Sequence, residues 1–257
     1  MPYAAFDLSG RTAIVTGAGR GLGRGMAEAL AQAGARVVCA GRTMASIEET
    51  ADKIRSAGGE AEPFLFDAVK RSDCQRLVAE TAARHGKLDI MVVNHGIALA
   101  APAVEVTDHD WSETIAVNLT GAFLCAQAAG RQMIAQGKGG SIVLISSNAS
   151  LVGFHDLTAY GASKGGVDQL CRQLSIEWGP HRIRVNAVNP GYTTNNMAGG
   201  DERHATVSLA EEIRRMTPLG RRGSVAEIAR PVVFLASDAA AFVSGVCLAV
   251  DGGYCAF

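Results

Sequence analysis

The sequence is poor in several features, and each scarcity excludes a class of protein. Aromatic residues make up 5% and charged residues 19% of the 257-residue chain, and the formal net charge is −1. So balanced a charge provides no basic surface for nucleic acid or for an anionic membrane. No apolar run approaches the ~20 residues that span a bilayer, and the N-terminal residues lack a signal-peptide pattern. We therefore expect a cytoplasmic protein without a nucleic-acid or membrane partner.

Cysteine and proline are also sparse and scattered. No two of the six cysteines have the Cys-x-x-Cys spacing of zinc and redox sites, so we expect neither a metal nor a disulfide framework. This favours a reducing compartment. The seven prolines form no linker that would divide the chain. A chain of this length could form one domain or two; because no linker divides it, we expect one domain over residues 1–257.

What the chain has in abundance is an alternation of short apolar runs with longer amphipathic stretches. The former are typical of buried strands and the latter of helices. Such an alternation predicts an α/β fold, a doubly wound parallel sheet with helices on both faces. The expected strands cover residues 13–15, 37–40, 61–66, 90–93, 142–145, 185–188 and 246–250. In this architecture, ligands bind at the carboxyl ends of the strands.

Glycine concentrates between the first expected strand and the first helix. Gly17, Gly21 and Gly23 have the spacing Gly-x-x-x-Gly-x-Gly. Glycines let the backbone approach a pyrophosphate, and the N-terminus of the following helix supplies amide donors and a partial positive charge. The turn therefore predicts a phosphate-binding cradle; the alternative is a flexible turn that binds nothing.

Tyr160 and Lys164 are four residues apart in a predicted helix, which puts both side chains within reach of a shared ligand. A tyrosine loses its proton near pH ~10, and a neighbouring ammonium lowers the pKa of the phenol. Lowering it to neutrality needs ~3 units, or roughly 4 kcal/mol, which one lysine alone does not supply. Taken in isolation, the pair is better explained by an exposed tyrosine stacked on a lysine stem.

Together these motifs resemble those of the short-chain dehydrogenase/reductase family, and the resemblance covers nearly the whole chain. Further motifs follow in the family's order: Asn-His-Gly at 94–96, Asn-Leu-Thr-Gly at 118–121, Ile-Ser-Ser at 145–147, Asn-Pro-Gly at 189–191 and Val-Asp-Gly-Gly at 250–253. The resemblance implies a Rossmann-type fold and an NAD(P)-dependent oxidoreductase that interconverts a carbonyl and a secondary alcohol on a small substrate. The pattern is similar to 3-oxoacyl-carrier-protein reductases and to keto-sugar or polyol dehydrogenases.

The resemblance assigns catalytic roles to Asn118, Ser147, Tyr160 and Lys164. Tyr160 is the expected general acid in carbonyl reduction and general base in alcohol oxidation, with its pKa lowered by Lys164 and by a positively charged nicotinamide ring. Lys164 also holds the nicotinamide ribose, and Ser147 binds the carbonyl oxygen. Asn118 holds a water that connects Lys164 to solvent; alternatively, its amide satisfies the backbone in a helix kink.

The choice of cofactor depends on the end of the second expected strand. Gly41 stands where an NAD site usually carries an acidic residue. Arg42 and Arg20 offer guanidinium groups to a 2′-phosphate, unless both are ordinary surface arginines. We therefore expect NADP(H) as the preferred cofactor and NAD(H) as the alternative. By resemblance, the other cofactor contacts are Gly17, Gly21, Leu22, Asp67, Ala68, Asn94, Gly96, Tyr160, Lys164, Pro190, Gly191, Thr193 and Asn195.

Three positions depart from the family pattern. His95 replaces a small residue beside the cofactor, where it could touch the substrate or ribose or simply pack. Ala68 stands where a bulkier apolar residue normally contacts adenine. Asn195 replaces the threonine that bonds the nicotinamide carboxamide, and Thr193 or Thr194 could equally take that role.

Residues 193–219 break the strand–helix alternation. They include a predicted helix at 208–216 and precede a helix near Val225, which Ser224 and Glu227 cap. An insertion at the ligand edge is more often a lid than a disordered crossover, and the family closes this region over its substrate. The expected substrate contacts suit a small ketone, keto acid, keto sugar or 3-oxoacyl thioester. They are Asn148, His155, Tyr192 and Met197.

Alternatives concern both activity and assembly. A non-catalytic dinucleotide sensor on the same fold predicts a damaged catalytic set, whereas all four catalytic residues are present. An epimerase or dehydratase would need a bulkier pocket than the short C-terminal part allows. The family's usual assembly is a homotetramer built on the long helices after the fourth and fifth strands. Residues 254–257 could bury in such an interface.

Overall fold

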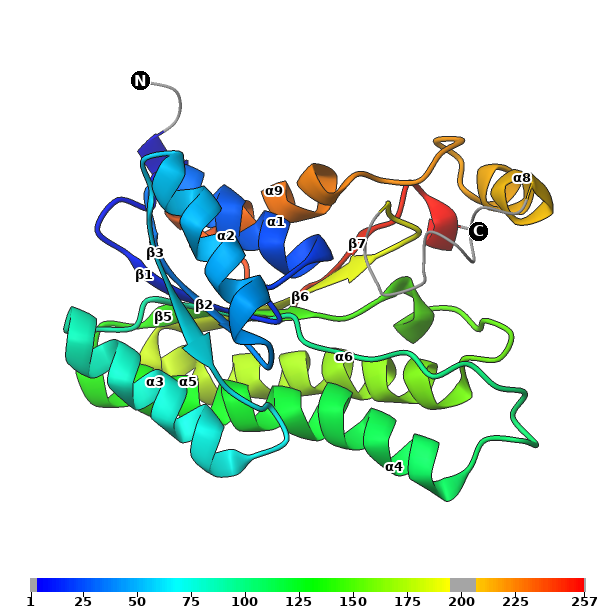
Figure 1. The fold of residues 1–257 in the computed structure, drawn as a ribbon, viewed down its shortest axis with the longest axis horizontal. Coiled ribbons are helices and arrows are strands. Elements are labelled where there is room, and N and C mark those ends of the chain that lie inside the picture. Colours follow the sequence, from blue (N-terminus) through cyan, green and yellow to red (C-terminus); the bar gives the residue numbers. More distant parts are fainter. Residues whose placement is uncertain (1–3, 195–206, 257) are drawn as a thin grey trace.

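A computed structural model describes residues 4–194 and 207–256 of the chain. Each of the strands expected from the sequence is present, and together they form one parallel sheet in the order β3-β2-β1-β4-β5-β6-β7 (Figure 1). The Rossmann-type fold is thus confirmed. The strands are β1 (Thr12–Thr16), β2 (Arg36–Gly41), β3 (Glu60–Leu65), β4 (Ile90–Val93), β5 (Gly140–Ile145), β6 (Ile183–Pro190) and β7 (Cys247–Val250).

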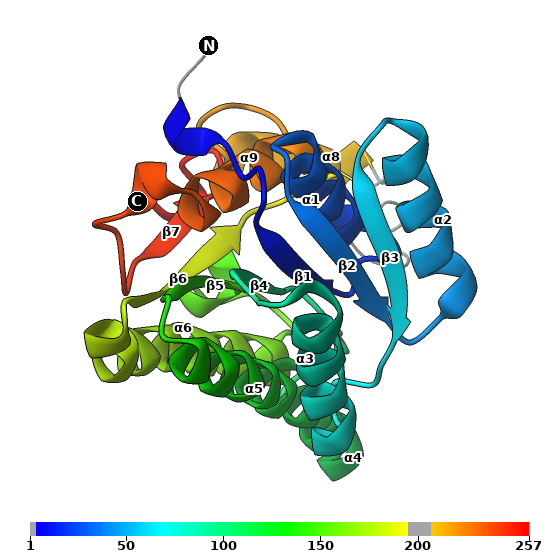
Figure 2. The ribbon, with the colours of Figure 1, turned by 90° about the vertical axis from the view of Figure 1, so that its left-hand side faces the viewer.

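Helices cover both faces of the sheet, which Figure 2 shows from its side. Successive strand residues point to opposite faces, so Ile14 joins one hydrophobic core and Val15 the other. No helix in the described ranges is long and apolar enough to cross a bilayer. One layer holds α1 (Gly21–Gln32), α2 (Met44–Ser56) and α9 (Val225–Ala236). The other holds α3 (Arg71–His85), α4 (Asp108–Ile115), α5 (Gly121–Gln136) and α6 (Thr158–Trp178).

The register of the strands places the predicted motifs at one edge. Ile14 of β1 lies opposite Val38 of β2 and Met91 of β4, so these strands end close together. β1 is where the strand order switches, because β2 and β3 lie on one side of it and β4 to β7 on the other. A ligand site is expected at the carboxyl ends of the strands beside this switch.

Short 3-10 turns occupy Ala4–Phe6, Asn148–Ser150, Gly179–His181, Asp238–Ala240 and Tyr254–Ala256.

Both helices predicted around residues 193–219 are confirmed. α8 (Val207–Met216) begins one residue before the predicted start. α9 begins at Val225 behind the predicted capping box, in which the Glu227 amide donates to Ser224 Oγ (3.3 Å) and the Ser224 amide donates to Glu227 Oε2 (2.8 Å). The role of this segment as a lid stays a prediction.

Candidate active site

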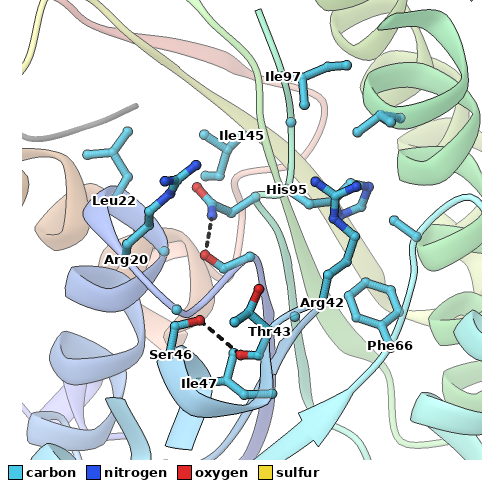
Figure 3. Close-up of a pocket in the computed structure, with 18 of the residues that line it drawn as sticks. Arg20, Leu22, Arg42, Thr43, Ser46, Ile47, Phe66, His95, Ile97 and Ile145 are labelled. Atoms are coloured by element: carbon cyan, nitrogen blue, oxygen red, sulfur yellow. Dashed lines mark hydrogen bonds between the residues drawn. The ribbon is translucent and has the colours of Figure 1, made fainter. Parts of the chain in front are cut away.

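A cavity of about 500 Å³ opens at the carboxyl ends of the central strands (Figure 3). Loops after β1, β2, β4, β5 and β6 contribute to its wall, as the doubly wound architecture requires. Of the predicted cofactor contacts, Gly21 and Thr193 are not part of this wall, and Asn195 lies outside the described residues. The wall includes Gly17, Arg20, Leu22, Arg42, Asp67, Ala68, Asn94, Gly96, Tyr160, Lys164, Pro190 and Gly191.

The glycine turn is tightly packed against the end of β4. Gly17 has a φ of +65° and Gly21 a φ of +53°, which are left-handed conformations that glycine adopts readily. A Cβ on Gly23 would collide with the carbonyl oxygen of Gly17 and lie 2.5 Å from Asn94 Nδ2. The N-cap residue Arg20 makes no side-chain cap, so the first amides of α1 are available to an anion. The turn thus has the close packing expected of a phosphate cradle, and its role in binding phosphate stays a prediction.

Two arginines reach into the cavity beside the cradle, Arg20 from the glycine turn and Arg42 from the loop after β2 (Figure 3). Both are exposed, and neither forms an ion pair with another residue in the described part of the chain. Gly41 is buried, and a Cβ there would lie 2.9 Å from Cγ2 of Ile47. A side chain at this position would therefore require the Ile47 methyl group to shift.

His95 forms part of the wall between the cradle and α5. Its Nδ1 lies 2.9 Å from Thr16 Oγ1, and its ring packs edge-on against Phe66 with centroids 6.1 Å apart. Its Nε2 lies near Gly121, where an added Cβ would come within 2.9 Å. Burial, with a smaller contribution from the Lys164 ammonium, lowers the pKa of His95 to about 3. The imidazole is therefore neutral at physiological pH.

Three of the predicted catalytic side chains meet at the other end of the cavity. Ser147 follows β5, and its Oγ accepts a hydrogen bond from the Ala149 amide (3.1 Å). Tyr160 and Lys164 lie one turn apart on α6, with Lys164 Nζ 5.7 Å from the centroid of the tyrosine ring. The predicted convergence of these residues is what the structure shows, although their catalytic roles remain predictions.

The ionisation of this group differs from the expectation for Tyr160. Burial raises the pKa of Tyr160, and a hydrogen bond with Ser147 lowers it by less. The Lys164 ammonium donates to the carbonyl oxygen of Ile145 (2.8 Å) instead of to the phenol. Burial lowers the pKa of Lys164 to about 8, and the carboxylate of Asp168 partly offsets that effect. The protein alone therefore does not prepare a phenolate, as the weakness of a single lysine implied.

Asn118 lies behind the cavity in a π-helical turn, Ala116–Thr120, between α4 and α5. Its Oδ1 accepts from the Ile97 amide (2.8 Å), and its Nδ2 donates to the Ile97 carbonyl (2.9 Å) and to Ser163 Oγ (3.0 Å). These contacts satisfy the backbone, which is the structural alternative raised from the sequence. A Cβ on Gly96 would lie 3.3 Å from Asn118 Oδ1 and 3.5 Å from Lys164 Nζ, so Gly96 lies next to both side chains.

The predicted substrate contacts do not gather in the main cavity. Asn148 is buried and its Oδ1 accepts from Ser147 Oγ (3.3 Å), while His155 is exposed. Tyr192 packs against Phe154 and Tyr254, with ring centroids 6.0 and 5.8 Å away. None of the three predicted residues lines the cavity, and Met197 lies outside the described residues. Sequence reasoning missed this aromatic cluster because its members are far apart in the chain.

Comparisons with known proteins agree with this geometry. A family model described as enoyl-(acyl carrier protein) reductase matches residues 17–255. D-threitol dehydrogenase of Mycolicibacterium smegmatis is 36% identical over 97% of this chain and 94% of the relative. 2-Dehydro-3-deoxy-D-gluconate 5-dehydrogenase of Escherichia coli is 37% identical over 100% of both chains. The chain therefore belongs to the short-chain dehydrogenase/reductase family.

Solved structures show the same likeness. A gluconate 5-dehydrogenase from Burkholderia cenocepacia, in complex with NADP and tartrate, has a TM-score of 0.93 and 35% identity over 98% of both chains. A short-chain type dehydrogenase/reductase from Mycobacterium marinum has a TM-score of 0.92 and 34% identity over 97% of both chains. The protein is accordingly an NAD(P)-dependent oxidoreductase that interconverts CH–OH and C=O groups.

Proposed function

We propose that the protein interconverts a small polyol or sugar acid and the corresponding keto compound, with NADP(H) as the preferred cofactor and NAD(H) as the alternative. The substrate class is supported by relatives named as dehydrogenases of threitol, galactitol and gluconate. The cofactor preference is carried by one observation. Arg20 and Arg42 flank the cavity, and Gly41 stands where an acid would crowd the Ile47 methyl group.

The residues of the cavity fit a dinucleotide along its whole length. The cradle of Gly17 and Gly23, which a Cβ would fill, would hold the pyrophosphate at the start of α1. The two arginines would hold a 2′-phosphate, because guanidinium groups bind phosphate oxygens in pairs. Asp67 would bind the adenine amino group. When bound, the nicotinamide supplies or accepts the hydride.

The positions of the side chains support the catalytic roles that we propose. Tyr160 would exchange a proton with the substrate oxygen, which Ser147 would hold by a hydrogen bond. Lys164 would bind the ribose hydroxyls and, with the positive charge of the oxidised nicotinamide, favour the phenolate. Asn118, fixed by Ile97 and Ser163, would hold the proton relay to solvent. The segment 193–219 would act as the lid of one domain that spans the chain.

Replacing Arg42 by Asp tests the cofactor preference. The loss of a charged hydrogen bond to a 2′-phosphate corresponds to about 1.5–3 kcal/mol, so the ratio of kcat/KM for NADPH over NADH should fall by about tenfold or more. Lys138→Asp makes the same change of charge in the exposed turn before β5, at the opposite edge of the sheet, and should leave the ratio unaltered. An unchanged ratio in Arg42→Asp would refute the assignment.

We also propose a homotetramer and a cytoplasmic location. Large apolar side chains are exposed on the helices that the family uses for assembly, with Trp111 of α4 42% and Ile176 of α6 73% accessible. All six cysteines are free thiols, which suits a reducing compartment. Light scattering on the purified protein should give four times the 26.7 kDa chain mass. A monomeric mass would refute the assembly.

A further inference from the structure

A cluster of buried polar side chains lies directly behind Ser147. Asp168 is 3% exposed and sits on α6 one turn after Lys164. Its Oδ2 accepts hydrogen bonds from Ser150 Oγ (2.6 Å) and from Nδ2 of Asn189 (2.8 Å), which is fully buried at the end of β6. Burying an acid is costly unless it is hydrogen-bonded or paired, and nothing in the roles described above uses this carboxylate.

The cluster holds the carbonyl group of Ser147 from behind. The Ser150 hydroxyl lies 2.6 Å from both the Ser147 carbonyl oxygen and Asp168 Oδ2, so its single proton is shared between these two acceptors. Asn189 Nδ2 donates to the Ser147 carbonyl oxygen (3.2 Å) and lies 2.7 Å from Ser150 Oγ. The carbonyl and the hydroxyl belong to the same residue, so fixing the one restricts the other. Asp168 thereby anchors, through Ser150 and Asn189, the turn from which Ser147 Oγ reaches the cavity wall.

The carboxylate also acts on Lys164 through space. Lys164 is 4% exposed, and in the described part of the chain no acid lies within ion-pair distance of its Nζ. The groups that face it are Tyr160 on the same helix, the neutral His95 after β4 and the neutral amide of Asn118 in the π-helical turn. Among the described residues, Asp168 is the one whose charge raises the pKa of Lys164.

We propose that Asp168 is a positioning residue for the reaction, which fixes the turn carrying Ser147 and keeps Lys164 protonated for cofactor binding. It does not line the cavity, so it acts through Ser150, Asn189 and its electric field. The proposal rests on the roles proposed above for Ser147 and Lys164. One buried carboxylate would then fix the position of Ser147 and maintain the charge of Lys164.

The direction of the pH effect follows from the charges. Burial lowers the pKa of Lys164 to about 8, and Asp168 works against that lowering. Side chains one helical turn apart are ~6 Å from each other, and at an effective dielectric constant of about 20 this interaction corresponds to about one to two pH units. Without the carboxylate, Lys164 should lose its proton at lower pH. The alkaline fall in cofactor affinity should then move to lower pH.

The test is a fluorescence titration of NADPH binding between pH 5.5 and 9.5, with kcat measured in parallel. Asp168→Asn keeps the acceptor for Ser150 and Asn189 and removes the charge. It should move the alkaline fall by about one to two units to lower pH. Asp168→Glu retains the charge, and Ser150→Ala removes one anchor of Ser147. In both variants the alkaline fall in NADPH affinity should occur at the wild-type pH. Ser150→Ala should in addition lower kcat about tenfold or more. Dividing the NADPH affinity of each variant by the wild-type affinity at the same pH cancels the effect of titrating the cofactor's own phosphate.

An alkaline fall at the wild-type pH in Asp168→Asn would overturn the charge role, and an unchanged kcat in Ser150→Ala would overturn the anchoring role. If Asp168→Asn does not fold, Asp168→Ser provides the neutral variant, because its smaller side chain leaves space for water beside Asn189. Failure of the wild type to bind NADPH or NADH at any pH would contradict the proposed function instead. The two failures are therefore distinguishable.

Discussion

One added methyl group at Gly23 should disable the cofactor site, whereas the same group at Gly165 should not. In Gly23→Ala the new Cβ would overlap the carbonyl oxygen of Gly17, a backbone atom that cannot rotate away. It would also lie 2.5 Å from Asn94 Nδ2, which donates to the Gly17 carbonyl over 3.3 Å. The start of α1 must therefore shift away from the glycine turn, and this hydrogen bond must lengthen.

The size of the effect follows from these contacts. Overpacking a tight site costs about 1–3 kcal/mol, and a lost hydrogen bond adds about 0.5–1.5 kcal/mol. Gly23→Ala should therefore lower the free energy of unfolding by about 1.5–4 kcal/mol. For a domain of this length, each kcal/mol corresponds to about 2–4 °C, so Tm should decrease by between about 3 and about 16 °C. A displaced cradle should weaken NADPH binding by about tenfold to a hundredfold.

Gly165→Ala is the matched control on α6, next to Lys164. A Cβ there meets no atom within 4 Å, and alanine favours a helix interior over glycine by about 0.5–1 kcal/mol. This variant should keep its affinity for NADPH and melt at the wild-type temperature or slightly above. Thermal unfolding and NADPH fluorescence titration measure both quantities. Wild-type affinity in Gly23→Ala would refute the view that the close approach of Gly23 and Gly17 forms the phosphate cradle.

Two further predictions concern residues behind the cavity. The unfolded state takes up a proton at His95 near pH 6.5, while the folded state does so only near pH 3, so stability is lost as pH falls below 6.5. At pH 5 this loss is about 2 kcal/mol, and His95→Ala should abolish it in urea unfolding, whereas replacing the exposed His109 should not. Asn118→Leu removes its three hydrogen bonds, to Ile97 and Ser163, and should cost about 3 kcal/mol of unfolding free energy. A loss below about 1 kcal/mol would contradict that role.

Local sequence patterns were sufficient to predict the fold. Strands such as β1 and β4 were recognisable because they are buried throughout and so read as continuous apolar runs. The start of α9 followed from Ser224 and Glu227, which interact within one turn. Motifs that directly follow strands, such as Gly17 and Ser147, reach the same edge by topology alone.

Features that depend on contacts between distant segments could not be predicted from the sequence. His95 binds Thr16 across the strand switch, and neither residue indicates the other in the chain. The direction of the pKa shift of Tyr160 depends on its burial, which is a property of the assembled site. Asp168 had one local signal, its spacing of four residues from Lys164, but its partners Ser150 and Asn189 come from other elements.

The central claim is that Tyr160 and its neighbours perform NADP(H)-dependent carbonyl chemistry. The most direct test measures NADPH and NADH oxidation with a panel of keto sugars, keto acids and simple ketones, using wild type and Tyr160→Phe. We predict that wild type turns over a keto sugar or keto acid faster with NADPH. Tyr160→Phe should bind NADPH as tightly and lose about 10²–10⁴ of kcat, the usual contribution of a positioned acid or base. Undiminished turnover in Tyr160→Phe would contradict the account.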